Sequence, residues 1–172
     1  MVNARKILLP VLCVLAAAAM NAGEAPVSPG ALFPGLAVDG ITGGTVPATK
    51  GKVAIIDFWA SWCAPCKASF PVYSRLQDAY AGRGLVIIGV SVDESASAYS
   101  SFVAKHAPSF ATVHDSRHLL VGAVQVPTMP TSYLVDRSGK VRFIHAGFHG
   151  DTTEREIRAE VEQLLAEGPG AP

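Results

Sequence analysis

The 172-residue sequence has little charge and no excess of either sign. It contains 14 Lys and Arg and 14 Asp and Glu, and charged residues make up only 16% of the chain. A nucleic-acid-binding domain needs a basic face to neutralise phosphates, so this balance argues against that class. Apolar residues reach 49%, which excludes a chain that is disordered throughout. The length suits one domain of ordinary size.

Cysteine is scarce: the sequence has Cys13, Cys63 and Cys66. Three cysteines are too few for a scaffold held by disulfides. A zinc site needs four ligands, and the chain has no second Cys-x-x-Cys pair and no suitably spaced histidine pair. A disulfide across two residues closes too small a loop to stabilise a fold much. The pair Cys63 and Cys66 therefore points to redox chemistry rather than to structure.

The first apolar run is short for a membrane span. It covers Ile7–Met20, follows Arg5 and Lys6, and ends among small residues. This layout is typical of a secretory signal. We expect residues 1–22 to be a signal peptide that removes Cys13 on cleavage, with an uncleaved N-terminal membrane anchor as the alternative. The protein is accordingly expected to be exported to the periplasm or another extracytoplasmic location.

The rest of the chain divides into a lead-in, one domain and a tail. Residues 23–33 are rich in Pro, Ala and Gly and are expected to form a linker. The domain is expected to span residues 34–167, followed by a flexible tail at 168–172. Short apolar pieces at Leu36–Val38 and Thr45–Pro47 flank several glycines, a pattern that predicts an N-terminal hairpin.

Strand-like and helical patterns alternate through the domain. Continuous apolar runs predict buried strands, and apolar residues at i, i+3 and i+4 spacing predict helices. The final helix is expected to open with a capping box at Thr153 and Glu156. The predicted strands are at 53–58, 85–92, 110–113, 132–135 and 141–144. The first predicted helix follows Cys63 and is stopped by Gly82 and Gly84, and the others are at 99–106, near 119–124 and at 153–165. This order predicts an α/β domain whose mixed sheet is parallel first and antiparallel at the end.

The Cys-x-x-Cys pair lies at the start of a predicted helix that follows a buried strand. Unpaired N–H groups and the helix dipole favour a thiolate there, so Cys63 is the expected nucleophile. Cys66 lies one turn deeper and is expected to act as the resolving thiol. Trp62 and Pro65 flank the pair, and Pro65 suits an early helical position because its missing N–H has no partner there anyway.

The segment Phe58–Lys67, FWASWCAPCK, resembles the active-site signature of the thioredoxin superfamily. It is particularly similar to exported TlpA/ResA-like thiol-disulfide oxidoreductases. Pro71 matches the helix-kinking proline of that fold, and Pro130–Asp136 resembles its cis-proline strand. The resemblance implies a thioredoxin fold: a mixed central sheet flanked by helices, an N-terminal β-hairpin extension and a central βα insertion.

The resemblance also implies a substrate-binding surface. Met129–Pro130 would be a cis peptide bond facing the dithiol, and the backbone at Met129 would pair with an extended substrate strand. Trp62 and Pro65 would contact the same substrate. Val126–Pro127 remains a rival cis site, although the following strand favours Pro130.

Two acids are candidates for proton transfer by resemblance. Asp57 matches the thioredoxin carboxylate that handles the proton of the resolving cysteine, and Glu94 matches a ResA-like acid with a comparable task. Gly89 occupies the place of the lysine that accompanies this carboxylate in thioredoxins. A buried carboxylate without a cation should have a raised pKa and accept a proton near neutral pH. The sequence leaves the choice between the acids open, with Asp57 slightly favoured.

Together these features predict an exported thiol-disulfide oxidoreductase, most simply a protein-disulfide reductase whose only redox group is the Cys63–Cys66 disulfide. The Ala-Pro dipeptide resembles that of reductases rather than the His-containing pairs of strong oxidants. The resemblance implies exported substrates with cysteine pairs, such as an apocytochrome c during cytochrome c biogenesis, and a membrane thiol reductant as electron donor. No resident cofactor, metal or nucleic-acid partner is expected.

Two alternatives stay open. The first is a thiol oxidant or isomerase of the same fold. The second is a copper-handling chaperone that uses Cys63, Cys66 and His145. A peroxidase would need a cysteine in a Pro-x-x-x-Thr-x-x-Cys context, which this sequence lacks.

Overall fold

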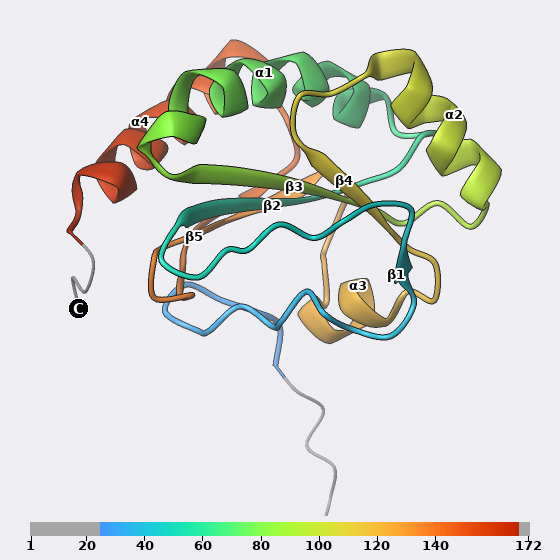
Figure 1. Ribbon diagram of the computed structural model, residues 1–172, viewed down its shortest axis with the longest axis horizontal. Coiled ribbons are helices and arrows are strands. Elements are labelled where there is room, and N and C mark those ends of the chain that lie inside the picture. Colours follow the sequence, from blue (N-terminus) through green and yellow to red (C-terminus); the bar gives the residue numbers. More distant parts are fainter. Residues whose placement is uncertain (1–24, 169–172) are drawn as a thin grey trace, which may run out of the picture.

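A six-stranded mixed sheet carries the domain, with helices on both of its faces (Figure 1). The structure is a computed structural model that describes residues 25–168. The sheet order is β1-β4-β3-β2-β5-β6, and the neighbours β2, β3 and β4 are parallel while β1, β5 and β6 pair antiparallel. The strands are β1 (Ile41–Thr42), β2 (Val53–Trp59), β3 (Leu85–Ser91), β4 (Ala111–Asp115), β5 (Thr131–Val135) and β6 (Val141–Ala146). The helices are α1 (Ala64–Tyr80), α2 (Ala96–His106), α3 (Leu119–Val124) and α4 (Asp151–Ala166), with a short 3-10 helix, η1 (Ala81–Arg83).

The two faces of the sheet are covered by different elements. Helices α1, α2 and α4 lie on one face, and α3 with the N-terminal segment lies on the other (Figure 1). Strand β2 is buried along its whole length, because it lies at the centre of the sheet with both faces covered. Side chains alternate along a strand, so Val53, Ile55 and Trp59 pack under α1 while Ala54 and the other even positions face α3. Asp57 therefore lies on the face beneath α1.

The predicted fold is confirmed in its main elements. The fold is thioredoxin-like, with α2 and β4 inserted between β3 and α3 as the expected central addition. The apolar positions predicted for the first and last helices are all buried: Phe70, Tyr73, Leu76 and Tyr80 in α1, and Ile157, Val161, Leu164 and Leu165 in α4.

The predicted N-terminal hairpin is wrong. Neither 36–38 nor 45–47 forms a strand, and the two-residue β1 pairs with β4 at the sheet edge instead. The glycines between these pieces serve close approach rather than a hairpin turn. A Cβ on Gly43 would lie 2.4 Å from the Tyr99 ring, and one on Gly44 would lie 2.1 Å from the Thr112 carbonyl oxygen. A short apolar pattern does not show whether such a segment forms a local hairpin or leaves the residues between its pieces to pair with a distant strand.

The predicted capping box of the last helix is also wrong. Helix α4 begins at Asp151, directly after Gly150, whose φ of 62° turns the chain before Thr153 is reached. Thr153 lies inside the first turn, where its Oγ1 accepts the N–H of His149 at 3.0 Å. Asp151 and Glu154 supply the negative charge that a helix N-terminus favours.

The described part of the predicted linker, residues 25–33, is held against the domain. The N–H of Val27 donates to the Val124 carbonyl at 3.2 Å, and that of Phe33 donates to the Gly139 carbonyl at 2.9 Å. This stretch is therefore part of the domain surface rather than a free linker. The predicted signal peptide at 1–22 and residues 169–172 of the predicted tail lie outside the described residues. Within 25–168, no helix combines the length and apolar character needed to cross a membrane.

Candidate active site

The two cysteines lie where β2 leads into α1. Cys63 is the N-cap of α1 and is bonded to Cys66 in a disulfide. The N–H of Cys66 donates to Cys63 Sγ at 3.2 Å, so a thiolate at Cys63 would keep a hydrogen bond and lie at the positive end of the helix dipole. The side chain of Cys63 is 4% exposed and that of Cys66 is fully buried. The outer sulfur is therefore placed to attack and the inner one to resolve.

The surroundings of the disulfide offer an exposed apolar rim. Trp62 is 68% exposed, and Pro65 is exposed within the first turn of α1. Met129–Pro130 is a cis peptide bond, as predicted, and the rival Val126–Pro127 bond is trans. Met129 is partly buried and packs against the core cluster that contains both cysteines. Trp62 and Pro65 thus lie exposed next to the cysteines, and Met129, which the cis bond joins to Pro130, packs against the cluster that contains them.

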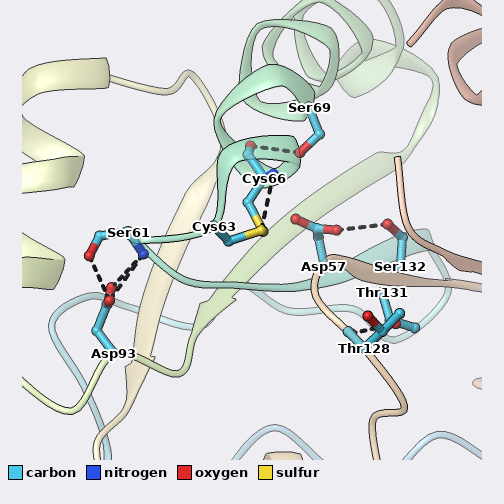
Figure 2. Close-up of a disulfide and its surroundings, with 9 residues drawn as sticks. All are labelled: Asp57, Ser61, Cys63, Cys66, Ser69, Asp93, Thr128, Thr131 and Ser132. Carbon is cyan, nitrogen blue, oxygen red and sulfur yellow. Dashed lines mark hydrogen bonds between the residues drawn. A yellow bond between two sulfur atoms is a disulfide. The ribbon is translucent and has the colours of Figure 1, made fainter. Parts of the chain in front are cut away.

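Asp57 is completely buried beside the dithiol. Its Oδ1 accepts the Ser132 hydroxyl at 2.7 Å, and its Oδ2 has no hydrogen-bond partner within residues 25–168. Figure 2 shows one carboxylate oxygen turned to Ser132 and the other on the side of the disulfide. Burial raises the pKa of Asp57 from 3.8 to about 7, against the opposing effect of the Ser132 and Tyr73 hydroxyls. This carboxyl group can therefore take up or release a proton near neutral pH.

No cation accompanies Asp57 on the neighbouring strand. Gly89 of β3 pairs with Asp57 in the sheet register, which is where the resemblance places the missing lysine. A Cβ at Gly89 would lie 3.0 Å from Trp59 Nε1 and 3.1 Å from Phe110 Cε2. The Trp59 indole therefore occupies the space that a side chain at residue 89 would need.

Glu94 lies apart from the buried carboxylate. It is exposed and lines a groove of about 600 Å³ together with Trp62, Val92 and Val121. The acid that reaches the active-site loop is its neighbour Asp93, which the sequence reasoning missed.

Asp93 is 2% exposed and binds the loop that leads into Cys63. Its carboxylate accepts the N–H of Ser61 at 3.0 and 3.1 Å and the Ser61 hydroxyl at 2.7 Å (Figure 2). It also accepts the Ser91 hydroxyl at 2.8 Å. These bonds fix the backbone two residues before the nucleophile. An acid directly after a buried strand was the available signal, but sequence alone did not show which of two adjacent acids turns inward.

Comparisons with known proteins agree with this geometry. The AhpC/TSA family model matches residues 29–144. Thiol-disulfide oxidoreductase ResA of Bacillus subtilis (strain 168) is 31% identical over 140 residues, which are 78% of this chain and 78% of ResA. The chain belongs to the AhpC/TSA family, within the thioredoxin superfamily.

The closeness to ResA narrows the activity within that family. ResA of Bacillus thuringiensis (strain Al Hakam) is 35% identical over 92 residues, 54% of this chain and 53% of that protein. A Chlorobium tepidum structure assigned as a thiol:disulfide interchange protein DsbE aligns with a TM-score of 0.73 at 29% identity, covering 81% of this chain and 99% of that one. This AhpC/TSA protein is therefore a thiol-disulfide oxidoreductase of the ResA/DsbE type.

The sequence did not indicate two further residues that lie around Asp57 in this thioredoxin-superfamily site. Ser132 of β5 and Tyr73 of α1 were assigned only to a strand and to an apolar helix face, yet their hydroxyls lie 2.5 Å apart and Ser132 bonds Asp57. Their sequence separations from their partners are 59 and 75 positions. No local pattern connects residues so distant along the chain.

Two histidines of this oxidoreductase make hydrogen bonds within the fold, and these contacts test the copper alternative. His114 is buried, and its Nε2 donates to the Asp93 carbonyl at 2.6 Å. His145 Nε2 lies 2.6 Å from Glu160 of α4 and is thus bound away from the cysteines. Residues 25–168 contain no group of three or more His, Cys, Asp or Glu arranged to hold a metal ion. The geometry gives the copper alternative no support.

Proposed function

We propose that this ResA/DsbE-type oxidoreductase reduces disulfides in exported proteins. The observation that carries the proposal is the difference between its sulfurs: Cys63 at the helix start borders an exposed rim, and fully buried Cys66 lies beside the neutral-pH acid Asp57. The Cys63 thiolate gains one backbone hydrogen bond and no charged side-chain partner among the described residues. Strong oxidants owe their potential to a very stable thiolate, so modest stabilisation favours a reducing couple.

The reaction proceeds by two thiol-disulfide exchanges. The Cys63 thiolate attacks a target disulfide, forming the Cys63–target mixed disulfide and releasing one target sulfur as a thiolate. Cys66 then gives its proton to Asp57, and its thiolate attacks Cys63 Sγ. The Cys63–Cys66 disulfide forms, the second target sulfur leaves as a thiolate, and Asp57 passes the proton on to that thiolate. Two electrons pass from the dithiol to the target.

Asp57 is the better supported of the two acids for this step. It lies on the β2 face beneath α1, the helix that carries Cys66, and its free Oδ2 is on the side of the disulfide (Figure 2). Glu94 is exposed in the groove beside Trp62. We assign Glu94 to the surface around the substrate, and proton transfer to Asp57.

The substrate and location extend the proposal further. The Met129 backbone forms no backbone–backbone hydrogen bond within residues 25–168, which leaves it free to pair with an extended substrate strand. The signal layout of residues 1–22 supports export, and the proposed substrates are then periplasmic or other extracytoplasmic proteins with cysteine pairs. An apocytochrome c is one such substrate, and a membrane thiol reductant would re-reduce the enzyme.

The test is the reduction potential of the Cys63–Cys66 couple, measured by equilibrating the protein in glutathione buffers. A value at or below about −230 mV is expected for a reductase. A value near roughly −120 mV would overturn the proposal in favour of the oxidant alternative. A Cys63→Ser variant is the control and should show no two-electron transition. Reduction of a peptide carrying an oxidised Cys-x-x-Cys-His pair would then test the apocytochrome class.

A further inference from the structure

We propose that Tyr73 and Ser132 are positioning residues that act through Asp57. The Ser132 hydroxyl, itself bonded to the Tyr73 hydroxyl, holds Oδ1 of the carboxylate, and this leaves Oδ2 as the oxygen that exchanges a proton with Cys66. The inference rests on the proposed role of Asp57 as the proton acceptor. It assigns to the site two residues that take no part in the exchange of sulfur bonds.

The direction of both hydrogen bonds follows from their chemistry. A carboxylate oxygen can only accept, so the Ser132 hydroxyl donates to Asp57 Oδ1 across 2.7 Å. The single Ser132 proton is then used, and its Oγ accepts the Tyr73 hydroxyl across 2.5 Å. Two donors in series therefore point toward the carboxylate. Chains of this kind strengthen one another at low dielectric.

Three separate elements meet in this arrangement. Asp57 of β2 and Ser132 of β5 are paired in the sheet register, and Tyr73 reaches them from α1. Tyr73 is seven residues after Cys66, which places both on one face of the helix. The helix that presents the resolving sulfur thus also presents the outer hydroxyl of the chain.

The hydroxyl chain is closed to solvent. Tyr73 and Ser132 are each 1% exposed, so the chain does not lead a proton to the surface. Oδ1 is occupied by Ser132, whereas Oδ2 is buried without a partner among the described residues and lies on the side of the disulfide (Figure 2). The free oxygen is therefore the one available to Cys66.

The other described elements around Asp57 offer no charged side chain in place of these hydroxyls. Strand β3 presents Gly89, and α1 presents Tyr73 and the disulfide-bonded Cys66. Strand β6 places His145 across from Ser132, but the His145 ring pairs with Glu160, and more distantly with Glu156, of α4. Hydrogen bonds to the charged form favour it. The hydroxyls therefore stabilise the charged carboxylate in part, as a neighbouring lysine would.

The experiment uses the Tyr73→Phe and Ser132→Ala variants of the full-length protein. The first readout is the titration of the Asp57 carboxyl carbon by NMR in the oxidised state. The second is the pH dependence of kcat/KM for reduction of a disulfide substrate. Ser132→Ala removes the donor to the charged carboxylate, and Tyr73→Phe removes the donor that strengthens it, so both midpoints should rise by on the order of one pH unit. Tyr133→Phe is the matched control: Tyr133 is equally buried and adjacent to Ser132, but faces the other side of the sheet, and its removal should leave both midpoints in place.

The outcomes separate this inference from the function it rests on. If both variants fold with the parent midpoint, the positioning role is refuted even where their stability falls. If Asp57→Asn leaves the pH profile of kcat/KM unchanged, the proposed proton acceptor itself is refuted. In the Asp57→Asn background, Tyr73→Phe should have no effect on that profile. A residual change there would mean that Tyr73 acts by another route and would overturn the inference.

Discussion

Replacing Asp57 with Asn should flatten the pH dependence of stability. The carboxyl is fully buried, and its pKa is raised from 3.8 to about 7 in the folded state. The folded protein therefore binds this proton more tightly than the unfolded chain does. The resulting stabilisation is fully present below about pH 4 and is lost as the pH rises through about 7.

The magnitude follows from the pKa values of the folded and unfolded states. A difference of one pH unit between them corresponds to about 1.36 kcal/mol, so the whole contribution amounts to about 4 kcal/mol. Between pH 5 and pH 8 the group should account for about 2–3 kcal/mol of lost stability. The asparagine leaves a buried amide without a partner at the Oδ2 position, which costs about 1–3 kcal/mol. That cost is the same at every pH, so it lowers the free energy of unfolding without changing how that free energy depends on pH.

The assay is denaturant unfolding of the oxidised protein at several pH values from 5 to 8, with the disulfide intact in both states. Subtracting the Asp57→Asn curve from the parent curve cancels the other titrating groups. Asp78→Asn, the same chemical change at an exposed position of α1, should give a curve parallel to that of the parent. A parallel Asp57→Asn curve would refute the reasoning, because it would mean that burial does not raise this pKa.

Three further predictions concern the loop, the core and the exchange step. Asp93→Ala should lower the free energy of unfolding by about 1–3 kcal/mol, because the active-site loop loses its buried acceptor; a change below about 0.5 kcal/mol in denaturant unfolding would contradict this. Gly89→Ala should cost about 1–3 kcal/mol through its contact with the Trp59 indole, whereas Gly82→Ala, with no atom within 4 Å of its new Cβ, should cost less, and equal losses would rule out the contact as the cause. Cys66→Ser should accumulate a mixed disulfide with substrate, visible by mass under non-reducing conditions, and its absence would show that the inner sulfur does not resolve the intermediate.

Much of the site could be read from local spacing. The Cys63–Cys66 pair, its place at a helix start and the buried face of α1 all depend on residues within one or two turns of each other. The cis bond at Met129–Pro130 was expected from the resemblance of Pro130–Asp136 to the family's cis-proline strand, and it is present. These features depend on short stretches of chain whose geometry neighbouring residues decide.

Other features required the assembled sheet. Neither the piece at 36–38 nor the piece at 45–47 became a strand, because the free edge of β4 pairs with β1 between them, and Asp93 rather than Glu94 reached the loop because of how β3 ends over Ser61. In both cases the competing segments or residues were close in the sequence and similar in composition. A local pattern carries too little information to separate them.

The contrast is sharpest at Asp57. The sequence by itself determined that an acid lies within an apolar strand, six positions before the nucleophile, on a chain that carries one dithiol. Tertiary structure alone decided what surrounds that acid: Ser132 beside it in the sheet, Tyr73 above it on α1 and no side chain at Gly89. The physical reason is that a pKa depends on burial and on the groups in contact with the carboxylate, and packing brings those groups together from distant parts of the chain.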